Sequence, residues 1–251
     1  MDKKHAFLIS IILTGLLAST IYIFSFIFQD NEKRKSVIIS RVIDGDTLET
    51  KDGTTIRLLN INAPEKNSPS HELSKSFLSS LINKTVELDI IGRDKYNRLL
   101  VRLYSPNYIN KDLVSLGLAS KFLVSDSETK SFAQAEAKAI SDGKGIWNHS
   151  KYYACFSTHI NKNEEFIVIE NKCAPINMNL WMLKDESRKA YIFNNFIINN
   201  STKIKIHSSY GKDNETDIFW NLKTSVWNND RDSLYLFDFE GKIVHHETYG
   251  Y

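Results

Sequence analysis

The sequence is poor in cysteine and carries almost no net charge. It has 2 cysteines in 251 residues, and 32 Lys and Arg against 30 Asp and Glu leave a formal net charge of +2. This balance gives no bulk attraction for a polyanion, so any such attraction must be local. No metal-ligand spacing with cysteine is found for His159, His207, His245 and His246. The sequence therefore does not indicate a Cys/His zinc site.

Cys155 and Cys173 lie close together in the sequence, after the midpoint of the chain. In an extracellular protein such a pair can form a disulfide bond, whereas the alternative is two buried free thiols. The spacing of the two residues does not decide between these alternatives.

Charged residues are absent from residues 6–28, AFLISIILTGLLASTIYIFSFIF. A charge-free run of this length can span a bilayer as a helix. The rival interpretation is a cleaved signal peptide, for which the run is long, although Leu17-Ala18-Ser19 leaves cleavage open. Lysines and arginines flank the run almost equally on both sides, so the positive-inside rule does not fix its orientation.

The stretch from Arg41 to Glu65, RVIDGDTLETKDGTTIRLLNINAPE, concentrates residues suited to chemistry. Two predicted strands flank Asp52-Gly53, a strong hairpin signal, so the end that carries Asp46 should return beside Asn62. Oxygen ligands of this kind suit a hard cation such as Ca²⁺. Arg57 on the returning strand offers a fork of donors to a phosphate.

The segment that follows alternates predicted strands and helices. An apolar stripe at helical spacing follows Ser70, a candidate N-cap, and strands are predicted over 85–91 and 99–104. A short helix from Asn110 and a later helix around Phe132 complete the pattern. Strands that come first, with helices interleaved and last, are typical of a small α+β barrel with helices packed on it.

These motifs carry a family resemblance. V-I-D-G-D-T, then I-R-L-L-N-I-N-A-P-E, then D-K-Y-N-R at 94–98 resembles the thermonuclease (staphylococcal-nuclease-like) family, over roughly Ser36 to Trp147. Separate blocks in the right order and at the right distances make the match specific. The resemblance implies an OB-fold barrel, a fold known for binding nucleic acids.

The resemblance also implies roles for individual residues. Asp46, Asn62 and the carbonyl of Ala63 would bind Ca²⁺, and Asp44 would shape the turn. Glu65 would be the general base for the attacking water. Phosphate would be held by Arg57 and Arg98, and the substrate by Lys95 and Tyr96. The sequence departs from the family at Asn62, where the family has Asp, and at 122–124, where Phe-Leu-Val replaces the tyrosines expected to stack on nucleotides.

From about Tyr152 onward, short β-rich runs separated by polar turns replace the helical stripes. This spacing predicts an all-β sandwich, with the tryptophans Trp181, Trp220 and Trp227 packed in its core. V-I-E-N, L-W-M-L-K-D, W-N-N-D-R-D and the L-F-D-F-E-G-K-I-V hairpin resemble the lamin-tail domain, over about Phe156 to His246. That resemblance implies an immunoglobulin-like sandwich and does not imply catalysis.

Together these observations predict three regions: a membrane or signal segment with linker over 1–35, a thermonuclease-like domain over 36–150 and a lamin-tail-like domain over 155–251. The expected function is that of a calcium-dependent endonuclease, a monomer that cleaves DNA and RNA to 3′-phosphate ends. It would be held outside the cell by residues 6–28, or secreted after signal cleavage. The alternatives are a nucleic-acid-binding module with weakened catalysis, or a surface adhesion or scaffold protein with a cell-surface partner for its C-terminal domain.

Overall fold

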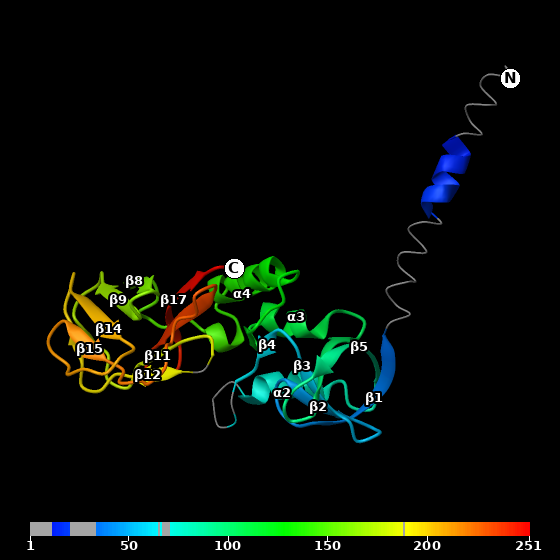
Figure 1. Cartoon of the computed structure of the whole chain (residues 1–251), viewed down its shortest axis with the longest axis horizontal. Helices are drawn as coiled ribbons and strands as arrows, with labels where there is room; N and C mark the ends of the chain where they lie inside the picture. The colour runs from blue at the N-terminus through cyan, green and yellow to red at the C-terminus, as the bar shows by residue number, and fades with distance from the viewer. Residues whose placement is uncertain (1–11, 21–33, 65, 67–70, 188) are drawn as a thin grey trace, which may run out of the picture.

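The computed structural model describes residues 12–20, 34–64, 66, 71–187 and 189–251 (Figure 1). Residues 12–20 form a helix, and the rest of the predicted membrane segment 6–28 lies outside the described residues. Among the described residues, no helix is both long enough and apolar enough to cross a membrane.

The first domain is built on a closed β-barrel with the strand order β1-β2-β3-β6-β5. Neighbouring strands are antiparallel except for β3 and β6, which run parallel. The barrel interior is filled by apolar side chains such as Ile39, Leu48 and Val101, which are fully buried. This agrees with the predicted OB-like barrel. The strands are β1 (Lys35–Val42), β2 (Thr47–Thr50), β3 (Thr55–Leu58), β5 (Thr85–Arg93) and β6 (Leu99–Tyr104).

The hairpin between β2 and β3 has the predicted turn. Gly53 adopts a φ of +81°, and its N–H donates to the Thr50 carbonyl over 2.9 Å. The register pairs Thr47 with Arg57, so Asp46 precedes the residue opposite the arginine. The returning chain then bends at Asn60, whose φ is +65°, and continues as the short strand β4 (Ile61–Asn62).

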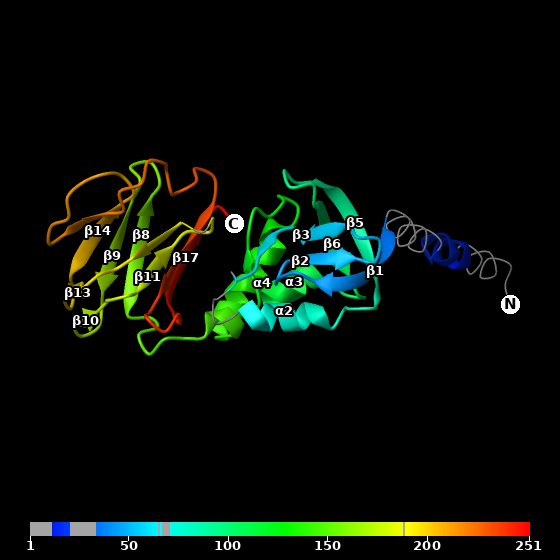
Figure 2. The same cartoon turned by 90° about the horizontal axis from the view of Figure 1, so that it is seen from below.

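Helices cover one end of this barrel and join it to the second domain (Figures 1 and 2). Strand β4 pairs with β7 (Ser120–Lys121), which lies between two of these helices in the sequence. The predicted cap Ser70 lies outside the described residues. The helices are α2 (His71–Ser79), α3 (Ile109–Ser115), α4 (Thr129–Ser141) and the 3-10 turn η1 (Gly145–Trp147).

The second domain contains two four-stranded sheets that enclose a common core (Figure 2). Trp181 and Trp227 are buried in this core and Trp220 packs against it, as predicted. One sheet has the order β15-β14-β9-β8 and the other β12-β11-β16-β17. The strands are β8 (Phe156–Asn161), β9 (Phe166–Asn171), β11 (Met182–Lys184), β12 (Ala190–Ile192), β14 (Lys203–His207), β15 (Asp217–Phe219), β16 (Asp232–Phe237), β17 (Ile243–Tyr249) and the small pair β10 (Ile176–Asn177) and β13 (Ile197–Ile198).

Cys155 and Cys173 form a disulfide bond with a Cα–Cα distance of 5.3 Å. It ties the residue before β8 to the segment that follows β9. Of the two alternatives that the sequence left open, a disulfide bond and two free thiols, the structure has the disulfide bond.

The two domains share a buried apolar cluster. Trp147 of the first domain stacks on Tyr235 of the second, with ring centroids 5.2 Å apart. Ile140 of α4 and Ile243 of β17 belong to the same cluster. Because this apolar surface is removed from water only when the domains are in contact, it holds the sandwich against α4. The chain's C-terminus lies beside α4 in both views (Figures 1 and 2).

Candidate active site

The turn before β2 places two carboxylates at the edge of the barrel. The Asp46 N–H donates to Asp44 Oδ1 over 3.1 Å, so Asp44 shapes the turn as expected. Gly45 lies between them at a very close approach, because a Cβ at this position would lie 2.6 Å from the Ser74 Cβ and 2.7 Å from the Ala63 Cβ. Glycine is therefore the residue that lets this turn pack against α2 and the chain after β4.

Asp46 is buried, with 5% of its surface exposed. Its Oδ1 accepts a hydrogen bond from the Thr47 hydroxyl, and its Oδ2 accepts one from the Ala63 N–H, both over 3.0 Å. Arg57 Nη2 lies 2.9 Å from Oδ2. Burial raises the pKa of the Asp46 carboxyl, and the Arg57 guanidinium opposes this rise. The carboxylate thus lies in a poorly hydrated position where an added cation would be strongly favoured.

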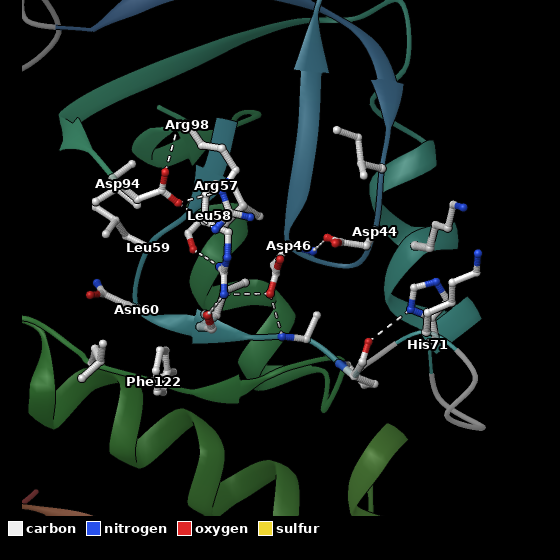
Figure 3. A pocket seen from close by; sticks show the side chains of 18 of the residues that line it. Asp44, Asp46, Arg57, Leu58, Leu59, Asn60, His71, Asp94, Arg98 and Phe122 are labelled. Atoms are coloured by element: carbon white, nitrogen blue, oxygen red, sulfur yellow. Dashed lines mark hydrogen bonds and ion pairs between the residues drawn. The ribbon is translucent and has the colours of Figure 1, made fainter. Parts of the chain in front are cut away.

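Arg57 is held from several sides in β3. Its Nη1 donates to the Leu58 carbonyl and its Nη2 to the Ile61 carbonyl, the latter over 2.9 Å. Together with the Asp46 contact, these bonds fix the plane of the guanidinium group. Figure 3 shows this side chain between the Asp46 turn and β4.

Arg98 enters the site from the turn between β5 and β6. Its Nε and Nη2 both lie 2.7 Å from Asp94 Oδ2, and its Nη1 lies 3.5 Å from the Thr47 hydroxyl (Figure 3). Burial would raise the pKa of Asp94, but hydrogen bonds from Arg98 and the Tyr96 N–H outweigh it and lower that pKa. Asp94 is therefore an ionised partner that orients Arg98.

Tyr96 and Lys95 lie on the same turn, outside the cavity that Arg98 lines. Tyr96 is 68% exposed. The Arg98 guanidinium carbon lies 5.5 Å from its centroid and Lys95 Nζ 5.0 Å from it. An exposed ring beside two cations is a suitable surface for a nucleotide base and its phosphate.

Strand β4 brings Asn62 and Ala63 to the Asp46 turn, as the hairpin predicted. Ala63 bonds to Asp46 through its N–H, while Asn62 is buried and is not among the described residues that line the cavity. The Asn62 carbonyl accepts a hydrogen bond from the Ser120 hydroxyl over 3.2 Å. The predicted general base, Glu65, lies outside the described residues.

A cavity of about 1080 Å³ joins these groups. Asp46, Ala63, Arg57 and Arg98 all face it, so most of the predicted site residues that the structure describes come together. The remaining lining residues are Ile43, Asp44, Leu58, Leu59, Asn60, Ile61, Pro64, Lys66, His71, Glu72, Lys75, Asp94, Leu100, Phe122, Leu123 and Ser187.

The donor atoms of this cavity fit calcium. Asp44 and Asp46 both contribute carboxylates beside Ala63, and hard oxygen ligands are what Ca²⁺ prefers. Among the described residues, no three or more His, Cys, Asp and Glu side chains gather closely enough to hold a metal ion by themselves, so backbone or amide oxygens would have to complete a site here. Oxygen donors next to a desolvated carboxylate favour a hard divalent cation over zinc.

Sequence reasoning missed several residues of the cavity. Asn60 donates to Glu128 Oε2 over 2.8 Å and accepts from the Ser125 N–H, which fixes the bend before β4. Its signal was an asparagine between two strand-like runs, a residue type that tolerates positive φ. Lys75 faces the cavity from α2, one helical turn after His71, so the i, i+4 spacing could have indicated a shared face. Ser187 belongs to the second domain, and no motif in the sequence around it indicates that it reaches the cavity.

Replacing Gly45 by alanine should displace the Asp46 turn. The new Cβ would meet the Cβ atoms of Ser74 and Ala63 well inside contact distance. We expect a loss of about 1–3 kcal/mol in the free energy of unfolding, as is usual for overpacked sites, together with weaker Ca²⁺ binding. Gly92→Ala is the matched control, because nothing lies within 4 Å of its Cβ position. Urea denaturation and calcium calorimetry measure both effects, and equal behaviour of the two variants would contradict the close approach.

Comparison with known proteins gives matches to both domains in turn. Residues 55–149 match the family described as staphylococcal nuclease homologue, and residues 155–251 match the lamin tail domain. An uncharacterized endonuclease of Haemophilus influenzae is 34% identical over 138 residues, covering 53% of this chain and 77% of that protein. An uncharacterized endonuclease of Escherichia coli O157:H7 is 39% identical over 87 residues, covering 32% of this chain.

The coverage of these relatives differs. The chain spans 57% of the Escherichia coli protein, and 11% of endonuclease YhcR of Bacillus subtilis, which is 30% identical over 138 residues. The Haemophilus relative is covered over 77% of its length, and the family match at residues 55–149 includes Arg57, Asp94 and Arg98. The chain belongs to the family of staphylococcal nuclease homologues, as an endonuclease-type hydrolase whose nuclease domain is followed by a lamin tail domain.

Proposed function

We propose that the protein is a calcium-dependent endonuclease that cleaves phosphodiester bonds of DNA and RNA and leaves 3′-phosphate ends. One observation carries this proposal: a buried carboxylate, Asp46, shares a cavity with two arginines, Arg57 and Arg98, that are oriented by hydrogen bonds. Phosphodiester hydrolysis requires positive charge at the phosphoryl oxygens, and oriented guanidinium groups supply it.

The chain's own residues divide the work. Asp46, Asn62 and the carbonyl of Ala63 would hold Ca²⁺, which when bound would polarise the phosphoryl oxygen as a Lewis acid. Arg57 is pre-oriented by two backbone carbonyls, so it binds phosphate with little loss of side-chain freedom. Arg98 is oriented by Asp94 in the same way. Glu65 would orient and deprotonate the attacking water.

Substrate binding would extend from the cavity onto the turn between β5 and β6. Tyr96 presents an exposed ring to a base, and Lys95 presents an ammonium group near that ring. Because bases of all kinds can stack on an aromatic ring, this surface supports action on both DNA and RNA.

Changing Asn62 to aspartate tests its predicted role as a ligand. An added carboxylate should tighten Ca²⁺ binding about tenfold or more, since affinity follows the charge of the ligands. The side chain is buried, so without a cation the same change should lower the free energy of unfolding. Calorimetry in Ca²⁺ and thermal denaturation with and without Ca²⁺ measure both effects. Unchanged affinity combined with lower stability would show that residue 62 is not a ligand.

Location is proposed on separate grounds. The charge-free residues 6–28 support a membrane anchor or a signal peptide. Both domains would then lie outside the cell as a monomer, where the lamin tail domain could bind a surface partner. The Cys155–Cys173 disulfide supports an oxidising compartment, because disulfides persist outside the reducing cytosol.

The end groups of the products test the reaction. The full chain is incubated with labelled single-stranded DNA and RNA in Ca²⁺, and the new termini are identified by their resistance to 3′ labelling before phosphatase treatment. We expect internal cleavage with 3′-phosphate ends. Binding without cleavage would favour a nucleic-acid-binding module. The observation that supports this alternative is Asn62, which stands where the family has Asp. Neither binding nor cleavage would favour a scaffold that works through the lamin tail domain.

A further inference from the structure

The lamin tail domain reaches the cavity of the nuclease domain. Ser187, in the turn between β11 and β12, lines the cavity beside Phe122 and Leu123. Leu123 is 70% exposed, although it is apolar. Its N–H lies 3.4 Å from Glu186 Oε1, so the two domains meet at this wall. One side of the cavity is therefore made by residues of both domains.

Residues 185–187 are held by hydrogen bonds within their own domain. Asp185 is fully buried, and its carboxylate accepts hydrogen bonds from the Ser187 hydroxyl and, over 2.7 Å, from the Lys189 N–H. The Glu186 N–H donates to Asp232 Oδ1 over 3.3 Å. A turn fixed by its own side chains can present Ser187 at a defined position.

A buried ion cluster holds the same turn against the nuclease domain. Lys121 of β7 is 1% exposed, with its Nζ 2.8 Å from Glu136 Oε2 and 3.7 Å from Glu186 Oε2. Lys121 Nζ also donates to the Ser233 hydroxyl over 2.6 Å, and the Tyr251 hydroxyl donates to Glu186. A buried cation that lost these partners would be strongly destabilising, so the contact between the domains is well defined.

This cluster adjoins the strand that supports the catalytic arginine. Lys121 is paired with Ile61 across the β7–β4 ladder, and the Ile61 carbonyl accepts the hydrogen bond from Arg57. The turn at 185–187 is thus connected to the nuclease site through one strand pair, and its position relative to Arg57 is fixed by the fold.

We propose that the 185–187 turn of the lamin tail domain is a substrate-binding wall of the nuclease site, so that the second domain contacts the nucleic-acid strand that the first domain cleaves. The proposal rests on the proposed function, because it takes a nucleic acid as the occupant of the cavity. The bound nucleic-acid strand would contact the apolar side chains of Phe122 and Leu123. Ser187 adds a small polar side chain to the same side of the cavity.

A charge series at Ser187 tests this proposal. Ser187 is exposed, so Ser187→Lys and Ser187→Glu leave the core intact. Ser187→Ala is the reference, because each variant loses the hydrogen bond to Asp185. A unit charge within a few ångströms of a phosphate in water is worth about fivefold in affinity. We expect Ser187→Lys to lower the KM for single-stranded DNA about fivefold and Ser187→Glu to raise it by a similar factor, with kcat unchanged.

The matched controls are Ser209→Lys and Ser209→Glu. Ser209 is an exposed residue in the bend after β14, and it does not line the cavity. In Figure 2, β14 lies farther from the nuclease domain than β17 does. These variants change the net charge of the full chain by the same amount. They should leave KM as it is in the unsubstituted chain. Equal shifts at positions 187 and 209, or no shift at either, would overturn the proposal.

A binding measurement separates this proposal from the proposed function. Fluorescence anisotropy with a phosphorothioate single-stranded DNA, with and without Ca²⁺, gives the dissociation constant for every variant without cleavage. If the unsubstituted chain binds this DNA but cleaves no nucleic acid, the proposed function fails, and the Ser187 series still decides the present proposal by its opposite shifts in affinity. If the chain neither binds nor cleaves, both proposals are overturned.

Discussion

Replacing Arg57 by lysine is expected to lower kcat about 10²- to 10³-fold, the usual cost of losing one oriented donor to a developing anion. A lysine ammonium cannot reproduce a planar fork that contacts Asp46 and two backbone carbonyls at once. The loss should appear mainly in kcat, because the arginine is needed where charge accumulates in the transition state. Single-turnover cleavage of a labelled single-stranded DNA measures it.

Arg41→Lys is the matched control for this substitution. Arg41 lies in β1 of the same barrel and also pairs with a carboxylate, with its Nη2 2.7 Å from Glu49 Oε2. It is exposed and does not line the cavity. Its replacement should leave kcat unchanged. Equal activity of the Arg57→Lys and Arg41→Lys proteins would contradict the role given to Arg57.

Replacing Glu65 by glutamine is expected to lower kcat about 10²- to 10⁴-fold, the range that general-base catalysis contributes. Glutamine keeps the size and the hydrogen-bonding oxygen of glutamate but cannot take a proton at neutral pH. Ca²⁺ affinity should change much less than kcat if the residue acts on water. Parallel measurement of cleavage rate and calcium binding separates the two effects.

Glu87→Gln is the control for the Glu65 variant. Glu87 lies on β5, where its carboxylate accepts a hydrogen bond from the Ser36 hydroxyl, and it does not line the cavity. The same change of charge should therefore leave the rate as it was. Full activity of the Glu65→Gln protein would show that Glu65 is not the general base.

Much of the fold follows from local sequence signals. Asp52-Gly53 fixes the β2–β3 hairpin, and the alternation at 99–104 gives β6 with its bounds. The strand-like run after Gly53 continues to Ile61 in the sequence, but β3 ends at Leu58, because Asn60 adopts a positive φ and the chain changes direction there. Strand β11 likewise begins only at Met182, because Leu180, with a φ of +63°, interrupts the β-rich run that starts at Met178. Asparagine is often found at positive φ, whereas leucine is rare there, so the sequence does not indicate the break at Leu180.

The site was predictable where its residues lie on one hairpin and its neighbouring turn. Asp46, Arg57 and Ala63 belong to one continuous stretch, and strand pairing brings their backbones together. Lys121 could not be assigned in this way, because a lone lysine normally reads as exposed, and its burial depends on partners more than a dozen residues away. Ser187 reaches the cavity only because the two domains pack together, which no local pattern encodes.

A calcium titration tests whether the Asp46 cavity is a calcium-dependent phosphodiesterase site. The rate at which the full chain cleaves 5′-labelled single-stranded DNA is measured in EGTA with rising free Ca²⁺, and with Mg²⁺ as the comparison cation. We expect no cleavage in EGTA, a saturable rise in rate with Ca²⁺ and little activity with Mg²⁺. Cleavage at the same rate in EGTA, or tight binding without cleavage at saturating Ca²⁺, would contradict this expectation.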